Sequence, residues 1–230
     1  MKLFILGFLM AQSVFAREVI IGGEPVLPNG QIAQTTVMIT GKSNAGEFIC
    51  TGTIIDEDIV VTAAHCLKGG AANMRVFFGK KPRSIDGYIR EKYADIGLIR
   101  LRDALPPGFR PAKILSGSLR VGESAILAGF GITNAKTGAG AGVLREVEVK
   151  IQAALGETEI LVDQSNGKGA CHGDSGGPAF AINGNQLLLW GVTSRAYSEM
   201  AVDDCAHGAV YTRINAYYSW IQDSIQALRL

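Results

Sequence analysis

The sequence has almost no net charge. Lys and Arg total 22 and Asp and Glu total 21 among 230 residues, so the formal net charge is +1. A basic face could form only beside an equally large acidic one, which argues against nucleic acid as the main partner. Charged residues are also scarce, at 19%, whereas hydrophobic residues reach 47%. This composition excludes an intrinsically disordered chain.

Long hydrophobic runs are absent beyond the N-terminus. Residues 1–16 begin with Met1 and Lys2, continue with an apolar run over 3–10 and end at Ala16. One positive charge, a short apolar run and small residues before the cut predict a secretory signal peptide over 1–16. The alternative is a membrane anchor, but the run is shorter than the roughly 20 residues that span a bilayer. We therefore expect a secreted protein, extracellular or periplasmic, with no membrane span after signal removal.

Cysteine is scarce as well, with four residues at positions 50, 66, 171 and 205. An even number of cysteines in an exported chain predicts two disulfides, because thiols oxidise outside the cytosol. Four cysteines allow three pairings, and their spacing alone does not choose between them. A zinc site would need close pairs such as C-x-x-C, and the sequence has none, so metal binding is the weaker interpretation.

Proline is infrequent, at 7 residues, whereas glycine is abundant, at 29. Short apolar or alternating runs recur between turn-forming residues, which predicts an all-β sandwich or barrel. The runs cover residues 36–39, 48–53, 59–62, 75–78, 96–101, 124–128, 143–151, 160–162, 187–193 and 209–213. Apolar residues at helical spacing predict a C-terminal amphipathic helix over 215–230, with Asn215 as its N-cap. The length fits one large β-rich unit or two small lobes.

Three short segments carry residues of chemical interest. Residues 61–66 read VTAAHC, residues 95–101 read DIGLIRL and residues 173–178 read GDSGGP. Each alone has an ordinary structural explanation, but together they supply the parts of a nucleophilic site. A serine hydroxyl needs a nearby base, a histidine can take and return its proton, and a carboxylate fixes the imidazole tautomer. Glycines beside the serine let backbone N–H groups face a developing oxyanion.

In these motifs, and in the order His65, Asp95, Ser175, the sequence resembles the chymotrypsin/trypsin-like serine endopeptidases. Subtilisins and α/β-hydrolases have other orders, and the resemblance extends from about Ile20 to the final helix. It implies two packed six-stranded antiparallel Greek-key β-barrels with a C-terminal α-helix, and a site in the cleft between the barrels. The peptidase domain would cover 20–230, with barrels at about 20–115 and 116–214 and the helix at 215–230. We expect no cofactor and no metal.

The resemblance also assigns catalytic roles. His65 would be the general base, Asp95 its orienting partner and Ser175 the nucleophile that forms an acyl-enzyme. The N–H groups of Gly173 and Ser175 would form the oxyanion hole. The resemblance further implies two disulfides, Cys50–Cys66 and Cys171–Cys205.

Residues 20–23 read IIGG, which looks like the activation sequence of the family. In the family a freed N-terminal ammonium pairs with the aspartate before the nucleophile, which implies an ion pair between Ile20 and Asp174. Most relatives carry a basic residue directly before this cut, whereas here Glu18 and Val19 follow Arg17. Signal removal would leave residues 17–19 as a short propeptide, whose removal we expect to activate the enzyme.

The resemblance implies an uncharged substrate pocket. The pocket floor in this family lies six residues before the nucleophile, here at Gly169, where trypsin-like members have an aspartate. Ala196 and Ala209 would stand in the walls, which favours Leu, Met, Phe or Tyr before the scissile bond, the P1 position. Alternatively, Asp203 or Asp204 could reach the pocket and select a basic residue, although solvated loop charges are the simpler interpretation.

Residues 194–196 would pair with the substrate backbone as an added strand. Ser194 matches the serine that the family places beside the triad, and Arg195 replaces the usual tryptophan, so preferences beyond P1 should be unusual. The expected partners are protein or peptide substrates and proteinaceous protease inhibitors. We expect the protein to be a monomer.

Two other classes of function compete with this interpretation. One is a catalytically silent binding module on the same fold, but such relatives usually lose a triad residue, and this chain has all three. The other is an esterase on another fold, since residues 173–177 match the loose pattern G-x-S-x-G. The order His, Asp, Ser and the lack of alternating helices argue against the esterase.

Overall fold

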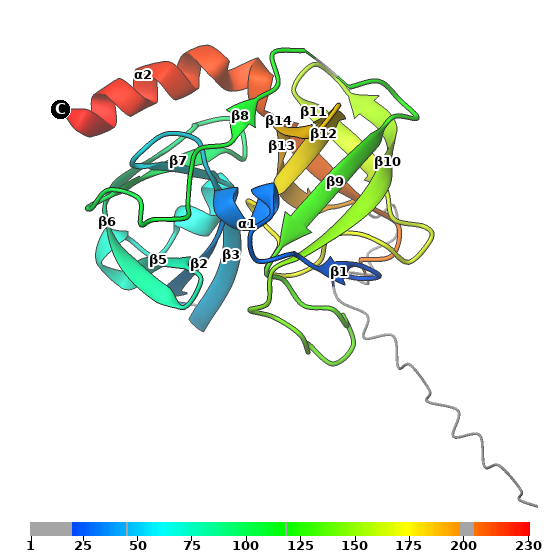
Figure 1. The fold of residues 1–230 in the computed structure, drawn as a ribbon, viewed down its shortest axis with the longest axis horizontal. Helices are drawn as coiled ribbons and strands as arrows, with labels where there is room; N and C mark the ends of the chain where they lie inside the picture. The colour runs from blue at the N-terminus through cyan, green and yellow to red at the C-terminus, as the bar shows by residue number, and fades with distance from the viewer. Residues whose placement is uncertain (1–19, 45, 118, 198–204) are drawn as a thin grey trace, which may run out of the picture.

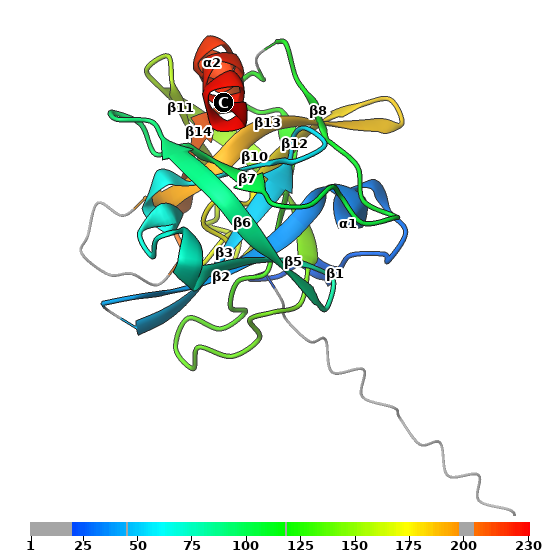
Figure 2. The same cartoon turned by 90° about the vertical axis from the view of Figure 1, so that its left-hand side faces the viewer.

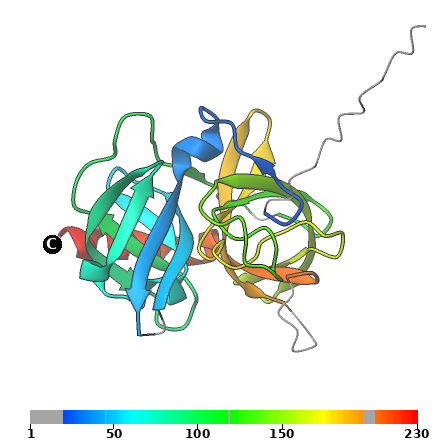
Figure 3. The same cartoon turned by 90° about the horizontal axis from the view of Figure 1, so that it is seen from below.

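The fold consists of two β-barrels that stand side by side in a computed structural model of the protein (Figures 1 and 3). The structure describes residues 20–44, 46–117, 119–197 and 205–230, so the predicted signal peptide and propeptide lie outside the described residues. Both barrels are closed, six-stranded and antiparallel, and an α-helix follows them at the C-terminus. The predicted fold class is confirmed.

The first barrel closes in the strand order β2-β3-β4-β7-β6-β5. Its strands are β2 (Thr36–Ser43), β3 (Gly46–Ile54), β4 (Ile59–Thr62), β5 (Met74–Phe78), β6 (Lys81–Arg90) and β7 (Gly97–Leu101). All four residues of β4 are buried, because both of its faces are covered. Val60 packs inside the barrel, whereas Ile59 and Val61, which point to the opposite face, pack against the second barrel.

The second barrel closes in the order β9-β10-β11-β14-β13-β12, because β9 pairs with both β10 and β12. Its strands are β9 (Ser124–Gly129), β10 (Arg145–Leu155), β11 (Glu159–Asp163), β12 (Pro178–Asn183), β13 (Gln186–Ala196) and β14 (Gly208–Arg213). Two short strands extend this sheet: β1 (Glu24–Pro25) pairs with β10, and β8 (Lys113–Ile114) pairs in parallel with β13. The N-terminal segment therefore lies on the second barrel before the chain enters the first.

A short helix, α1 (Gln31–Thr35), connects this N-terminal segment to β2. The Gln31 side-chain amide donates to the Leu187 carbonyl at 2.5 Å and accepts from the Leu187 N–H at 3.0 Å. This paired contact fixes the connection to the second barrel.

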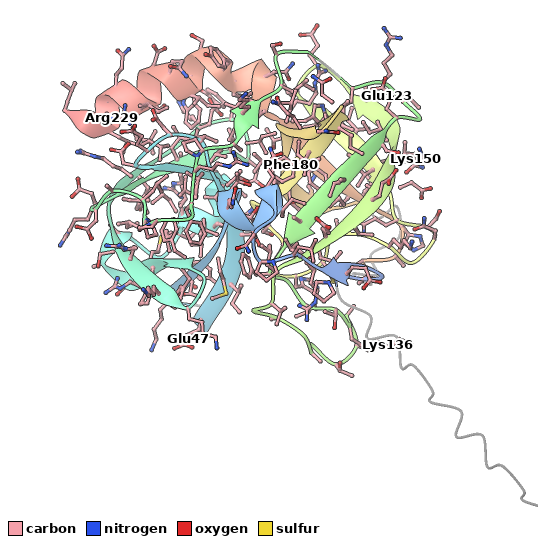
Figure 4. All side chains as sticks on the ribbon, in the orientation of Figure 1. Glu47, Glu123, Lys136, Lys150, Phe180 and Arg229 are labelled. Atoms are coloured by element: carbon pink, nitrogen blue, oxygen red, sulfur yellow. A yellow bond between two sulfur atoms is a disulfide. The ribbon has the colours of Figure 1, made fainter. Side chains whose placement is uncertain are left out.

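Buried apolar side chains in the described part of the chain form three clusters. Two fill the barrels, and the third lies between them. The third cluster joins Leu98 of the first barrel, Phe180 and Val192 of the second, and Ile221 of the C-terminal helix. Figure 4 labels Phe180 in the region where the two barrels meet. Because burial of this surface from water is favourable, the cluster holds the barrels in one relative position.

The apolar pattern does not predict strands β6 and β12. β6 reads KPRSIDGYIR, has Ile85 as its one buried residue and contains a bulge between Ile85 and Gly87, so it lacks simple alternation. β12 begins with Pro178 directly after the glycine-rich segment, where Gly and Pro indicate a turn. Both strands form because neighbouring strands supply their hydrogen-bond partners: β5 and β7 pair with β6, and β9 and β13 pair with β12.

The C-terminal helix begins later than predicted. A 3-10 turn, η3 (Ile214–Tyr217), precedes α2 (Tyr218–Arg229). The prediction that Asn215 caps the helix is wrong, because Tyr217 is the N-cap and the Asn215 amide instead donates to the Gly117 carbonyl at 2.9 Å. Ile221 and Ile225 of the predicted apolar face are buried in the third cluster, and Figure 2 shows α2 end-on above the strands. No helix in the described ranges is long and apolar enough to cross a membrane.

Replacing Phe180 with alanine should lower the free energy of unfolding by about 3–5 kcal/mol. The side chain is fully buried in the cluster between the barrels, so its loss leaves a cavity. Ile182 lies on the same strand but is 50% exposed, so Ile182→Ala should change stability by less than about 0.5 kcal/mol. Urea denaturation of both variants measures the difference, and equal losses would contradict the role of Phe180 in this cluster.

Candidate active site

His65 and Asp95 lie at the same end of the first barrel because neighbouring strands carry them. β4 leads into the 3-10 helix η1 (Ala64–Leu67), which holds His65, whereas Asp95 lies two residues before the start of β7. The strands are antiparallel, with Thr62 opposite Gly97, so the end of one meets the start of the other. His65 Nδ1 lies 2.8 Å from Asp95 Oδ2, and the His65 backbone N–H donates to Oδ1 at 3.0 Å. These contacts fix the ring through Nδ1 and leave Nε2 for another partner.

Ser194 of the second barrel binds the same carboxylate. β13 has a bulge between Thr193 and Arg195, so Ser194 is the extra residue in its pairing with β14. A bulge re-aims a side chain, and here Thr193 and Ser194 are both buried although they are consecutive. The Ser194 hydroxyl donates to Asp95 Oδ2 at 2.7 Å. Asp95 is therefore held from both barrels.

The environment of Asp95 favours its ionised form. Burial opposes ionisation, but hydrogen bonds from His65 and Ser194, together with the histidine charge, outweigh it and hold the pKa of Asp95 below its usual value. A carboxylate in this state stays negative at neutral pH and can stabilise a positive imidazolium beside it.

Residues 173–177 form a tight turn that packs against the first barrel. Gly176 has a φ of +80°, and a Cβ at this position would lie 2.0 Å from Thr62 Oγ1 and 2.4 Å from the Thr51 carbonyl oxygen. Glycine alone permits both the conformation and the approach. Thr51 of β3 holds the turn, because its N–H donates to the Ser175 carbonyl at 2.8 Å and its hydroxyl donates to the Gly173 carbonyl at 3.0 Å.

Ser175 lines the same groove as His65. This groove has a volume of about 930 Å³, and Gly173 and the Cys50–Cys66 disulfide also line it. Within the described chain the N–H groups of Gly173 and Ser175 donate no hydrogen bond. Because backbone donors rarely stay unpaired away from water, these two are available to an oxygen atom of a ligand.

Ile20 and Asp174 are both buried in the second barrel, each 1% exposed. Ile21 pairs with Gly169 through the backbone, so the N-terminal segment runs beside the chain that leads to Asp174. The Asp174 carboxylate accepts from the N–H groups of Gly131 and Cys171 at 2.8 and 2.9 Å. Burial raises the pKa of Asp174 to about 7, although the hydrogen bonds from these two donors and the positive charge of Arg145 lower it. This carboxyl is therefore difficult to ionise in the full-length chain.

Gly169 lies directly against the side chain of Gln164. A Cβ at Gly169 would lie 2.2 Å from Gln164 Cδ, so the amide fills the space that a larger residue would use. Gln164 donates to the carbonyls of Ala170 and Cys205 at 3.1 and 2.7 Å and accepts from the Ala170 N–H at 2.8 Å. The side chain directly beside Gly169 is thus an uncharged amide, and the Cys171–Cys205 disulfide joins the two segments that Gln164 bridges.

The other predicted pocket residues lie along β13 and β14. Ala209 is buried, whereas Arg195 and Ala196 are exposed at the end of β13. Arg195 forms a two-point ion pair with Glu159 of β11, at 2.5 and 2.8 Å. Asp203 and Asp204 lie outside the described residues.

Three residues of the site are missing from the sequence prediction: Thr51, Gln164 and Glu159. Thr51 contacts a carbonyl 122 residues away, and Glu159 pairs with an arginine 36 residues away. Their partners follow from the fold and not from local sequence. The sequence gives one indication of the role of Thr51, which is its polar side chain inside the apolar run at 48–53. A hydroxyl buried there needs a hydrogen-bond partner.

Both expected disulfides are present, and they also bear on metal binding. The described residues contain two groups of three potential ligands: Cys50, His65 and Cys66, and Cys171, His172 and Cys205. In each group the two cysteines are bonded to one another, which leaves a single histidine. Neither group therefore fits the donor set of a zinc site.

Replacing Thr51 with valine should lower the free energy of unfolding by about 1–3 kcal/mol, because the buried Phe130 N–H and Gly173 carbonyl both lose their partner. Thr51→Ser keeps the hydroxyl and is the matched control, with a smaller loss expected. Urea denaturation checks both variants. If serine and valine cost the same, the hydrogen bonds of Thr51 do not hold the turn at 173–177.

Comparison with known proteins agrees with this geometry. A family model described as Trypsin matches residues 20–221. The chain is 28% identical to brachyurin of Leptuca pugilator, over 88% of this chain and 97% of that protein. It is 27% identical to a chymotrypsin of Phaedon cochleariae, over 88% of this chain and 81% of that protein, and 28% identical to trypsin epsilon of Drosophila erecta, over 77% and 78%. The chain belongs to the trypsin family of serine endopeptidases.

Proposed function

We propose that the protein hydrolyses peptide bonds with Ser175 as nucleophile, His65 as general base and Asp95 as the carboxylate that orients His65. The observation that supports this most is the position of Asp95, which binds His65 from one barrel and Ser194 from the other. His65 and Ser175 line one groove, as the mechanism requires.

In the first step Ser175 Oγ attacks the substrate carbonyl carbon while His65 Nε2 takes the hydroxyl proton. The N–H groups of Gly173 and Ser175 donate to the oxyanion, and Asp95 stabilises the imidazolium. The C–N bond then breaks, and His65 gives its proton to the leaving amine. Water attacks the acyl-enzyme, His65 takes a proton from it, and Ser175 Oγ recovers that proton as the acid leaves.

We propose a P1 preference for Leu, Met, Phe or Tyr. Gly169 brings no charge to the pocket, and the polar atoms of Gln164 beside it are already bonded to the protein. A buried Lys or Arg of the substrate would have no partner there, which is costly. The alternative remains a basic P1 residue that Asp203 or Asp204 selects.

We further propose that cleavage before Ile20 activates the enzyme. The ammonium freed at Ile20 would supply a cation for the buried Asp174 carboxylate, which has only backbone donors and the nearby charge of Arg145 in the uncut chain. The ordered turn at 173–177 would then be stable with Asp174 ionised. We also propose a secreted monomer that loses residues 1–16 and whose partners include proteinaceous inhibitors.

A peptide library tests the catalytic proposal. Protein that begins at Ile20 should cleave after Leu, Met, Phe or Tyr at least tenfold better than after Lys or Arg, and Ser175→Ala should abolish cleavage. Mass spectrometry of the products gives the cleaved bonds. A phosphonylating reagent should modify Ser175 stoichiometrically. Strong cleavage after Lys or Arg would support the role of Asp203 or Asp204, and a chain that neither cleaves nor reacts would be a binding module.

The activation proposal predicts a specific pH dependence. A carboxyl with a folded pKa of about 7, above the usual 3.8, destabilises the folded state as pH rises from about 4 to 7, because the unfolded chain ionises first. Protein that begins at Ile20 escapes this penalty through the ion pair. The difference in Tm between forms that begin at Ile20 and at Arg17 should therefore widen from pH 4 to 7 and stay constant just above.

The matched control for this pH profile is Asp174→Asn in both forms, which should remove the widening. The form that begins at Arg17 should also show much lower activity at pH 7.5. Parallel Tm profiles, or equal activity of the two forms, would contradict the proposed pairing of Ile20 with Asp174.

A further inference from the structure

The groove at Ser175 extends away from the strand that would bind the acyl part of a substrate. Besides His65, Gly173 and Ser175, its lining comes from the ends of β2 and β3 and from the segments around Ile132 and His172. Residues 194–196 of β13, along which the acyl part would pair, are not among its lining residues. We call this the leaving-side groove, since on the proposed mechanism the peptide that departs would occupy it.

One wall of the leaving-side groove is rigid and apolar. Phe48 lies over Gly41, where a Cβ would come within 2.3 Å of the ring, so the ring rests directly on the backbone of β2. Gly69 supports the same ring, with a Cβ position 3.4 Å from Phe48 Cε1 and 2.8 Å from the Lys42 carbonyl oxygen. The segment after η1 is therefore packed closely against the end of β2.

That packing brings two lysines to the same region. Lys42 and Lys68 are both exposed, and both line the leaving-side groove and a smaller adjoining cavity of about 520 Å³. Neither forms an ion pair or a side-chain hydrogen bond in the described part of the chain. Lys42 stands opposite Glu47 in the pairing of β2 with β3, but no ion pair joins them within the described ranges.

The remaining charges near His65 do not neutralise these lysines. A third cavity beside His65 is lined by Lys68, Arg90, Glu91, Lys92 and Asp95. The Glu91 carboxylate accepts the N–H groups of Tyr93 and Ala94, and Asp95 is held by His65 and Ser194. Among the described residues that line these three cavities, the four cations Lys42, Lys68, Arg90 and Lys92 therefore outnumber the one uncommitted acid, Glu47.

We propose that Lys42 and Lys68 make the enzyme select polypeptides with acidic residues just after the scissile bond, at the second and third positions of the leaving peptide. This rests on the proposed function, because it requires an acyl-enzyme at Ser175. The lysines act as specificity residues and take no part in the chemistry. An exposed ion pair shifts a binding equilibrium by roughly 1.4- to 5-fold, so two pairs should give roughly 2- to 25-fold selection.

Acyl transfer measures this selection without changing the acyl half of the substrate. An ester of the preferred P1 residue forms the acyl-enzyme, which either water or an added peptide amine attacks. Attack by the amine forms a new C–N bond, releases Ser175 Oγ and passes the amine proton to it through His65. We would measure the ratio of aminolysis to hydrolysis for Ala-Asp-Asp-amide and for Ala-Asn-Asn-amide. Because the acyl-enzyme is the same in both cases, the difference between the two ratios reports only how each peptide binds on the leaving side.

The acidic peptide should capture the acyl group roughly 2- to 25-fold better than its amide twin at low salt. The preference should fall toward unity at 0.5 M NaCl, where exposed charges are screened. In the double variant Lys42→Met/Lys68→Met the preference should disappear, and in Lys42→Glu/Lys68→Glu a dilysine peptide should replace the acidic one as the better acceptor.

The matched control is Lys80→Met/Lys81→Met, which removes the same charge from exposed residues at the β5–β6 turn. This control should keep the full preference. Two results would overturn the role of the lysines and leave the proposed function intact. One is ester hydrolysis with equal capture of the two peptides, and the other is a preference that survives in Lys42→Met/Lys68→Met. Absence of any ester hydrolysis that depends on Ser175 would instead overturn the proposed function, and this inference with it.

Discussion

The site depends on how closely the turn at 173–177 can approach the first barrel. At Gly176 the backbone lies so near Thr62 and Thr51 that a single methyl group has no room. The Gly176 N–H at the same time donates to the Thr193 carbonyl at 2.8 Å, so the turn is held between the two barrels. Since Ser175 is the adjacent residue, its position follows from this contact. Packing alone therefore requires glycine at position 176, whatever the chemistry of the neighbouring Ser175.

Asp95 depends on the same docking of the barrels. Its burial alone would favour the neutral acid, and the donors that reverse this come from different barrels, His65 from the first and Ser194 from the second. The Ser194 hydroxyl can reach the carboxylate because of the bulge in β13. If the apolar cluster between the barrels were loosened, Asp95 would lose a donor and His65 part of its orientation. The core around Phe180 and the electrostatics of the histidine are therefore linked.

The sequence is informative where a local pattern controls the structure. Strand β4 is predictable because both faces are buried and three of its four residues are β-branched and apolar, and the apolar face of α2 is predictable from its spacing. Strands β6 and β12 are not predictable in this way. They form strands because they pair with neighbouring strands, and their own sequences lack a regular alternation of apolar and polar residues. Motifs place His65, Asp95 and Ser175 in the chain, but Thr51 and Gln164 acquire their roles from partners that only the fold brings near.

On the proposed mechanism, the two sides of Ser175 would recognise a substrate through different interactions, although the chain as a whole is almost uncharged. On the side where the acyl part would bind, Gln164 is bonded to backbone, and Arg195 is neutralised by Glu159. Under the proposed P1 preference, selection there would come from the shape of an apolar pocket, which discriminates weakly between similar side chains. On the leaving side Lys42 and Lys68 are exposed, and neither has an ion-pair partner in the part of the chain that the structure describes. The attraction of these lysines for an acidic substrate would therefore act over a long range and weaken with added salt. Selection by contacts in the pocket near Gly169 would act only at contact distance and would not depend on salt.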